Sequence, residues 1–292
     1  MLSFLGSRDK IRLQMKDHVF ITGFWNSGTT VLARLLSRHP DIKIKMSRGN
    51  PNYEETFIED SLQKIGLHLP HFELEKVTKY GLEPYTLASP QRAGEFAGYL
   101  RSHLGGKRRL LKNCRLFFCK ELLDNAFPKA KRIMILRDGG CQVISKGYWK
   151  KNADGGKDKL RNRAKLWDIC MEYHFTVWHK DPNTMTVRYE DLCNDTRSVM
   201  EEVCDFLLLD YKKLHHRLPL SLKNMNYKWN DFDGGLRQIV EEQITPSLKK
   251  LNELCPVKYS PKPKTDESLT FVDQTYLTCY ELAEKIVRKL GW

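Results

Sequence analysis

The chain has 292 residues, 41% of them hydrophobic, so it is long and apolar enough to bury a substantial core. Its 49 Lys and Arg residues outnumber its 36 Asp and Glu residues, and the net charge of +13 favours anionic ligands. The chain has no long basic tract, so only its overall charge points to nucleic-acid binding. No apolar run approaches the length of a membrane span, and charges interrupt positions 1–15 where a signal peptide would be apolar.

Four short apolar segments predict buried strands, separated by stretches with helical spacing. The predicted strands are residues 18–23, 110–113, 132–138 and 184–189. One helix is predicted after the first strand and ends before Pro40, and a second spans 159–180 with its Trp and Met residues on the core side. A third is predicted to start at a cap on Asn194 or Asp195, and a fourth covers about 272–290. Strands that alternate with helices predict an α/β fold, with a central parallel sheet flanked by helices.

The first strand runs into residues 23–30, Gly-Phe-Trp-Asn-Ser-Gly-Thr-Thr, which have the glycine spacing of a Walker loop. Thr29 stands at the position of the Walker lysine, and Thr30 at the hydroxyl position. In a nucleoside triphosphatase that lysine reaches the β- and γ-phosphates, so its absence argues against a triphosphate. The glycines, the amides of residues 27–30 and the helix N-terminus still suit one phosphate. An ordinary strand-to-helix turn is the alternative.

A second pattern begins at Arg137, which ends the strand at 132–138 and is followed eight positions later by Ser145. Open α/β folds bind ligands at the carboxyl ends of their strands. If a helix begins after residues 139–140, Ser145 lies about two turns along it. An arginine fork and a serine hydroxyl suit a second phosphate, whereas the alternative is a surface ion pair between Arg137 and Asp138.

A third block, residues 186–192 with the sequence Thr-Val-Arg-Tyr-Glu-Asp-Leu, runs from a strand into a turn. The three blocks, in this order and at these separations, resemble the sulfotransferases that use 3′-phosphoadenosine 5′-phosphosulfate (PAPS). The resemblance implies a P-loop NTPase-like sulfotransferase fold with a nucleotide-binding core at about 18–210. We expect residues 1–292 to form a single domain, in which the mainly helical region 211–292 is an appendage.

The resemblance also implies which residues bind the donor. In that family a Ser-Gly-Thr-Thr loop cradles the 5′-phosphosulfate, an Arg with a Ser eight residues on binds the 3′-phosphate, and a Tyr lies near the nucleotide. The residues assigned in this way are Ser27, Gly28, Thr29 and Thr30 for the first role, Arg137 and Ser145 for the second, and Tyr189 for the third. Trp25 is a candidate for stacking on adenine or lining the acceptor cleft, with simple packing as the alternative.

Sulfuryl transfer needs positive charge near the transferred group and a base for the acceptor proton. Relatives usually place Lys or Arg just before the Ser-Gly-Thr-Thr loop, but this chain has the uncharged Asn26 there. Lys112, at the end of the second predicted strand, is the leading candidate to supply the charge; a solvated lysine is the alternative. Asn26 also leaves open a catalytically impaired homologue that only binds nucleotide. Thr29 argues against the other alternative, a P-loop kinase.

For the base, the sequence Glu-Glu-Thr at residues 54–56 resembles a motif of the tyrosylprotein sulfotransferases, whose second Glu acts on the acceptor. This similarity assigns the role to Glu55, with Glu54 as the near alternative. An ordinary exposed glutamate at a helix start is the competing interpretation. His68 and His71 are the histidine candidates.

The eight cysteines are scattered and form no C-x-x-C pair, which predicts reduced thiols and a cytoplasmic location. No His, Cys and Asp residues show metal-ligand spacing, and the pair His215–His216 is expected to be solvated, so we predict no metal. PAPS has no γ-phosphate, which accounts for the missing lysine. The expected acceptor is a hydroxyl or amine of a small molecule.

Overall fold

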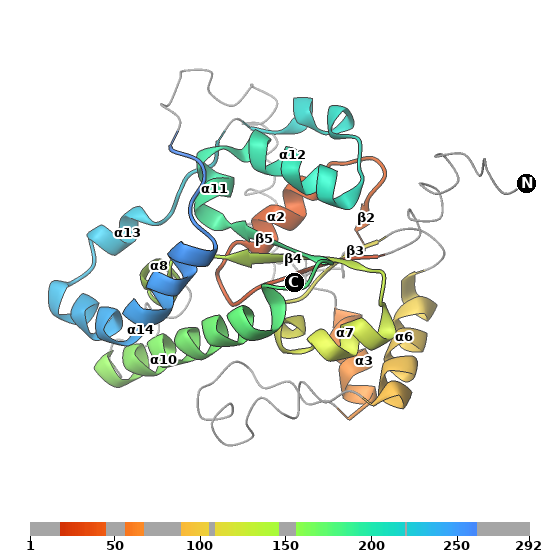
Figure 1. Cartoon of the computed structure of the whole chain (residues 1–292), viewed down its shortest axis with the longest axis horizontal. Helices are drawn as coiled ribbons and strands as arrows, with labels where there is room; N and C mark the ends of the chain where they lie inside the picture. The colour runs from red at the N-terminus through yellow and green to blue at the C-terminus, as the bar shows by residue number, and fades with distance from the viewer. Residues whose placement is uncertain are drawn as a thin grey trace, which may run out of the picture.

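The computed structural model describes residues 18–44, 56–66, 89–104, 109–145, 156–219 and 221–261. Within them, five parallel strands form one sheet in the order β2-β3-β1-β4-β5. The strands are β1 (Val19–Thr22), β2 (Lys43–Ile44), β3 (Arg109–Lys112), β4 (Lys131–Leu136) and β5 (Thr184–Arg188). Helices lie on both faces of this sheet (Figure 1). The predicted α/β fold with a parallel sheet is confirmed, as are its four predicted strands.

The longer helices connect successive strands or follow the last one. They are α2 (Thr29–Leu36), α3 (Thr56–Lys64), α6 (Pro90–Leu104), α7 (Lys120–Ala126), α10 (Gly156–Tyr173), α12 (Thr196–Leu207) and α14 (Gly234–Leu254). The short helical segments are η1 (Cys114–Phe118), α8 (Gly139–Val143), η3 (His174–Trp178), α11 (Tyr189–Asn194), η4 (Tyr211–Lys213), η5 (His215–Arg217) and α13 (Tyr227–Asn230). The side chain of Asp195 caps α12 by accepting a hydrogen bond from the Ser198 amide, as predicted.

Alternate residues of the strands supply two separate cores, because side chains along a strand point to opposite faces. On one face Phe20 and Met134 pack with α6, α7, α10 and α14. On the other face Ile21 and Ile133 pack with α2 and α12. Trp167 and Trp178 are 0% exposed, so the predicted core role of the aromatic residues at 159–180 is confirmed.

The position of β1 in the sheet determines where a ligand can bind. β1 lies at the centre, between β3 and β4, and the chain that leaves it reaches β2 and β3 on one side before it crosses to β4 on the other. Such a change of direction opens a crevice outside the carboxyl ends of the neighbouring strands. The loop that follows β1 therefore lies at the expected ligand site of this topology.

The structure corrects several predicted boundaries. The two-residue strand β2 was missed, since so short a segment has no periodicity to detect. The expectation of one regular helix over 159–180 is wrong at its end, because α10 gives way at His174 to a π-helical turn that adds a residue to the spacing. The helix expected at about 272–290 lies outside the described residues.

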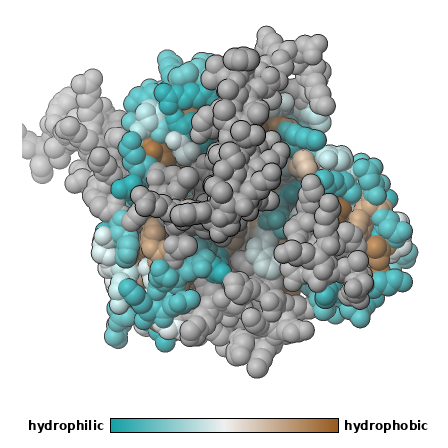
Figure 2. All heavy atoms as spheres, turned by 180° about the vertical axis from the view of Figure 1, so that it is seen from behind, coloured by the Kyte–Doolittle hydropathy of each residue, from teal (hydrophilic) through white to brown (hydrophobic). Residues whose placement is uncertain are grey.

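The surface of the described residues is mostly hydrophilic on the face shown in Figure 2, with small separate hydrophobic spots. Among the residues that the structure describes, the exposed large hydrophobic side chains are those of Leu208, Tyr227, Leu254 and Val257. No helix in the described ranges has both the length and the apolar character needed to cross a membrane.

Candidate active site

The loop after β1 is shaped around Gly23 and Gly28. A Cβ atom on Gly23 would lie 2.5 Å from the Ile135 carbonyl oxygen, so only glycine allows β1 and β4 to approach this closely. Gly28 has a φ of 105°, in the left-handed region, and a Cβ atom there would lie 2.6 Å from the Tyr189 ring. Both glycines of the predicted phosphate loop are therefore required by its conformation.

Helix α2 begins directly at this loop. Gly28 is its N-cap and provides no side-chain cap, and the first helical bond runs from the Leu32 amide to the Gly28 carbonyl. The start of a helix carries partial positive charge and amides that suit an anion. Ser27 lies just before it with a fully buried side chain, and its Oγ has no hydrogen-bond partner among the described residues. Buried polar atoms are usually satisfied, so this hydroxyl fits a ligand oxygen.

The two loop threonines differ in environment. Thr29 is buried, with its Oγ1 3.5 Å from the Cys114 Sγ, whereas Thr30 is half-buried. Cys114 also accepts a hydrogen bond on its carbonyl from Thr22 at 3.5 Å. The segment after β3 is thereby attached to the loop after β1, and this attachment brings Lys112 into the neighbourhood of the loop.

Lys112 is the last residue of β3 and pairs in register with Ile21 of the central strand. Its side chain is only 2% exposed. The alternative of a solvated strand-end lysine is therefore wrong, because neighbouring elements cover the side chain. Lys112 therefore places a buried basic side chain at the carboxyl edge of the sheet, on the strand next to β1.

Arg137 connects β4 to the loop. Its Nη1 donates a hydrogen bond to the Asn26 carbonyl at 3.0 Å, its Nε donates to the Asn226 Oδ1 at 2.8 Å, and its guanidinium lies 4.5 Å from the centre of the Tyr189 ring. The side chain is 7% exposed, so the alternative of a surface arginine is wrong. These contacts use two of the five guanidinium N–H groups, which leaves donors for a phosphate.

Ser145 lies beyond the end of α8, which spans only Gly139–Val143. The prediction that it sits two turns along a helix is therefore wrong. The two glycines that begin α8 allow close packing, since Cβ atoms on Gly139 and Gly140 would lie 2.9 and 2.6 Å from the rings of Trp167 and Trp229. The Ser145 Oγ is buried without a hydrogen-bond partner among the described residues, a second hydroxyl that suits a ligand.

Glu190 links residues near the ends of β4 and β5 through its carboxylate, a role that the sequence did not predict. One carboxylate oxygen accepts hydrogen bonds from the Asp138 amide at 2.9 Å and from Asn226 Nδ2 at 2.8 Å. The other forms an ion pair with Arg188 at 3.0 Å. Asn226 is the bridge between Glu190 and Arg137, and no sequence signal marked it, because its partners are distant in the chain.

The Tyr189 ring packs against Gly28 of the loop and against the Arg137 guanidinium. It is 6% exposed, and burial is the main cause that raises the pKa of its hydroxyl well above the ordinary value. The phenol is therefore neutral at physiological pH and cannot act as an anionic base. Its position supports the loop conformation directly, through the ring edge that meets Gly28.

Trp25 and Asn26 form the outer part of the loop. Trp25 is half-buried, stacks on Phe24 with ring centres 5.4 Å apart, and accepts a hydrogen bond on its carbonyl from Gln142. Asn26 is exposed and has a φ of 56°, a left-handed conformation that Asn tolerates better than most residues. Glu54 and Glu55, the predicted bases, lie outside the described residues, as do His68 and His71.

The structure thus brings together the phosphate loop, Lys112, Arg137 and Tyr189 at the carboxyl edge of the sheet, with Ser145 just after the helix that follows Arg137. Among the described residues, this edge offers the helix amides, the hydroxyls of Ser27 and Ser145 that lack partners there, and the buried side chains of Lys112 and Arg137. Such a set can bind two separated anionic groups and stabilise negative charge between them.

Comparison with known proteins agrees with this geometry. The profile of the sulfotransferase family matches residues 18–213. Among solved structures, the chain is similar to a sulfotransferase from Alicyclobacillus acidocaldarius, at 17% identity with a TM-score of 0.50 over 82% of this chain and 95% of that chain. Similarity at so low a sequence identity shows only that the two proteins share a fold.

Two further structures are similar at lower scores. The sulfotransferase domain of the Synechococcus PCC 7002 olefin synthase has 18% identity and a TM-score of 0.48 over 77% of this chain and 94% of that chain. Mouse sulfotransferase SULT7A1, complexed with PAP, has 13% identity and a TM-score of 0.47 over 86% and 95%. No curated protein matches the chain in sequence. Because the family profile covers well over half of the residues, the chain belongs to the sulfotransferase family.

Proposed function

We propose that this chain transfers a sulfuryl group from PAPS to a hydroxyl or amine of a small-molecule acceptor. The observation that supports this most strongly is the hydrogen bond from Arg137 to the Asn26 carbonyl. It joins the loop proposed for the 5′-phosphosulfate to the arginine proposed for the 3′-phosphate. PAPS carries phosphate at both its 5′ and 3′ ends, and the product adenosine 3′,5′-bisphosphate (PAP) retains both.

The residues present fit such a donor. The unpartnered hydroxyl of Ser27 and the amides at the start of α2 suit the 5′ group. Arg137 and the unpartnered hydroxyl of Ser145 suit the 3′-phosphate. The loop has Thr29 where a triphosphatase has lysine, so the donor set offers less to a γ-phosphate.

The donor supplies an activated sulfuryl group, and the chain supplies position and charge. The loop holds the donor in line with the acceptor, which lowers the entropic part of the barrier. Lys112 neutralises the negative charge that grows on the oxygen between sulfur and phosphate, where a buried ammonium acts strongly. Glu55, with Glu54 as the alternative, is proposed as the base that removes the acceptor proton.

Asn26 is the reason to keep a second candidate, a homologue that binds the nucleotide without turnover. An exposed amide with no charge stands where relatives carry a cation. If Asn26→Lys creates sulfuryl transfer that the parent chain lacks, the second candidate replaces the first. A parent chain that turns over the donor excludes it.

Lys112 gives the sharpest test of the proposed chemistry. The chain is incubated with PAPS carrying labelled sulfate and a panel of phenols, sugars, amines and alcohols, and transfer is counted. We expect Lys112→Met to lower turnover by about 10²–10³-fold, as loss of one charge-stabilising group does. PAP binding should change by less than about tenfold. The matched control is Lys129→Met, which removes an exposed lysine and should leave turnover unchanged.

Full turnover by Lys112→Met would remove this residue from the mechanism. No melting shift with PAP and no label transfer to any acceptor would overturn the proposed function as a whole. The cytoplasmic location and the small size of the acceptor are predictions of this proposal. The second is tested by the size of the compounds to which labelled sulfate is transferred.

A further inference from the structure

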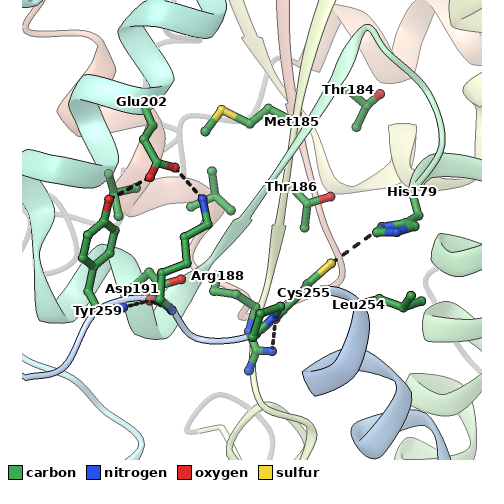
Figure 3. A pocket seen from close by; sticks show the side chains of 14 residues that line it. His179, Thr184, Met185, Thr186, Arg188, Asp191, Glu202, Leu254, Cys255 and Tyr259 are labelled. Atoms are coloured by element: carbon green, nitrogen blue, oxygen red, sulfur yellow. Dashed lines mark hydrogen bonds and ion pairs between the residues drawn. The ribbon is translucent and has the colours of Figure 1, made fainter.

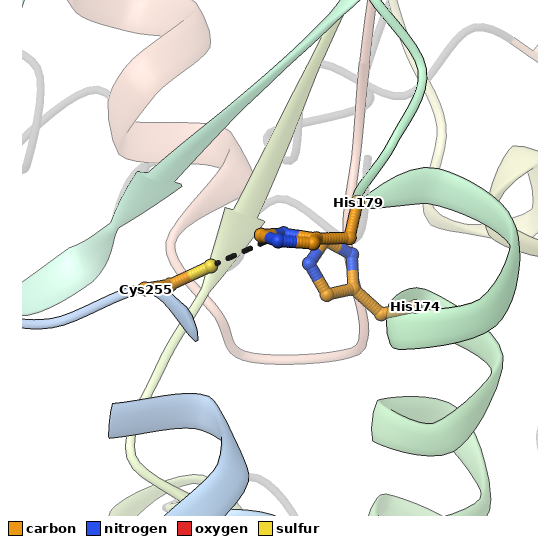
Figure 4. Close-up of side chains that lie close together, drawn as sticks. All are labelled: His174, His179 and Cys255. Atoms are coloured by element: carbon orange, nitrogen blue, oxygen red, sulfur yellow. Dashed lines mark hydrogen bonds between the residues drawn. The ribbon is translucent and has the colours of Figure 1, made fainter. Parts of the chain in front are cut away.

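Three side chains with metal-ligating atoms meet beside the edge strand β5. They are His174, His179 and Cys255, whose ligand atoms all lie within 4.8 Å of one another. Figure 4 shows the two imidazole rings and the thiol close together. Sequence spacing did not mark this group, because 76 positions separate His179 from Cys255.

The π-helical turn η3 makes this arrangement possible. His174 begins η3, and the His179 amide donates to the His174 carbonyl at 2.9 Å, a bond from residue i+5 to residue i. In an α-helix, residues five apart point about 140° away from each other. The wider turn brings them to the same side of the helix. Single π-turns are often found at functional sites.

His174 is the strongest sign that a ligand is bound here. It is 0% exposed, and neither of its ring nitrogens has a hydrogen-bond partner among the described residues. Buried polar atoms are normally satisfied by protein, water or an ion.

Cys255 completes the set from the other side. It directly follows α14, and its Sγ lies 3.7 Å from the His179 Nδ1. Two ligands on one tetrahedral zinc ion are about 3.5 Å apart, given Zn–N of about 2.0 Å and Zn–S of about 2.3 Å. The Cys255 carbonyl is held by Arg188 at 2.9 Å, which fixes the backbone that presents the thiol. This pair is therefore close to the separation that one zinc ion requires, and the three ligand atoms together lie within 4.8 Å of one another.

The surroundings leave space for a fourth ligand. His179 and Cys255 border a cavity of about 260 Å³ that runs along β5, as Figure 3 shows. Zinc sites with three protein ligands take water or a substrate atom in the fourth position. Two imidazoles and one thiolate form a donor set of intermediate softness, which suits Zn²⁺ and not Mg²⁺ or Ca²⁺.

We propose that His174, His179 and Cys255 bind one Zn²⁺ ion, with water from the cavity as fourth ligand. The Cys255 thiol loses its proton to solvent as the Zn–S bond forms, and the metal keeps its oxidation state. The ion joins the turn η3, which continues α10, to the residue that follows α14; α10 and α14 already pack together (Figure 1). Zinc binding therefore stabilises the fold.

Cobalt is the probe for this site, because Co²⁺ binds zinc ligands and is visible in absorption spectra. The full-length chain, treated with chelator and then dialysed, is titrated with Co²⁺. We expect one equivalent to bind, with a thiolate-to-cobalt charge-transfer band that Zn²⁺ abolishes. Separately, Zn²⁺ at a hundredfold excess over its Kd should raise Tm by about 5 °C, and chelator should reverse the rise.

The variants identify the ligands. Cys255→Ala should lose the charge-transfer band, and His179→Gln should weaken Co²⁺ binding at least tenfold. The controls are Cys204→Ala, which removes a buried thiol on α12, and His215→Gln, which removes an exposed imidazole; both should bind Co²⁺ normally. The proposal is overturned if the parent chain gives no thiolate band, or if the band survives in Cys255→Ala. Both outcomes can be read without any variant of the fully buried His174.

Discussion

At the scale of single residues, the site geometry depends on Gly28 and Asn226. Gly28 combines a φ of 105° with a Tyr189 ring that occupies the space of a Cβ atom. Asn226 holds the Nε of Arg137 and also donates to Glu190, so it fixes the direction in which the guanidinium points. The first position was recognisable from the motif and the second was not.

Gly28→Ala should damage both stability and ligand binding. The left-handed backbone and the ring contact together should lower the free energy of unfolding by about 1–3 kcal/mol. PAP binding should be lost, because the loop amides move. The matched control is Gly94→Ala in α6, where the added Cβ meets no atom within 4 Å and should stabilise the helix by about 0.5–1 kcal/mol. Equal melting temperatures for the two variants would contradict this account.

Asn226→Ala should weaken PAP binding while the fold persists. Without its oxygen the Arg137 Nε loses a partner, and the guanidinium becomes free to turn away from the ligand. We expect the Kd for PAP to rise roughly tenfold, or about 1.4 kcal/mol, with little change for adenosine 5′-phosphate. Calorimetry with both nucleotides measures this, and Asn230→Ala on α13, which is exposed, is the control. Equal losses for the two nucleotides would argue against a 3′-phosphate contact.

The residues that the sequence predicted well are those that follow a local rule. The loop glycines and the strand-end arginine lie within single motifs, and both occupy the expected edge of the sheet. Trp229 and Asn226 approach the site from a segment that sequence patterns describe only as helical, because their partners are about ninety positions away. Single-sequence patterns carry no information about contacts at that separation.

At the scale of elements, the turn that precedes β5 is joined to β4 by a buried ion pair between Asp181 and Arg132. Asp181 bonds Arg132 of β4 at 3.1 Å, and Arg132 is only 1% exposed. Burial raises the pKa of Asp181, but hydrogen bonds from Thr184 and the Asn183 amide, with the charges of Lys120 and Arg132, outweigh it. The pKa is therefore below its ordinary value. The ionised carboxylate holds two neighbouring strands together.

This depressed pKa predicts how stability depends on pH. The contribution of Asp181 is complete above the unfolded-state pKa of about 3.9 and is lost as pH falls through the lower folded-state value. Asp181→Asn should therefore cost about 2 kcal/mol at pH 7 and clearly less near pH 3. Urea unfolding at both values measures it. Asp158→Asn, whose ion pair with Arg161 is exposed, is the control and should change little. A cost that does not vary with pH would refute the assignment.

Element types were easier to predict than element ends. Helix α2 and strands β1, β3, β4 and β5 have strong periodicity, and the structure contains them. The two-residue β2, the short α8 and the π-turn at His174 depend on packing and on one added residue, which periodicity does not record. Ser145 was misplaced for this reason, since its expected position assumed a longer α8.

At the scale of the whole molecule, the sheet places its ligand site by topology. The chain leaves the central strand in one direction and later returns on the other side. The loop after β1, Lys112 at the end of β3 and Arg137 after β4 therefore lie at the same edge of the sheet. The C-terminal region contributes to this site through Asn226 and to the core through Ile244 and Leu251.

The central claim is that the chain binds a nucleotide with separate 5′ and 3′ phosphates rather than a triphosphate. Isothermal titration calorimetry of the full-length chain with PAP, adenosine 5′-phosphate and ATP with Mg²⁺ tests it directly. We predict that PAP binds one to one without metal, at least tenfold more tightly than adenosine 5′-phosphate. Tighter binding of magnesium ATP, or no binding of PAP, would contradict the account.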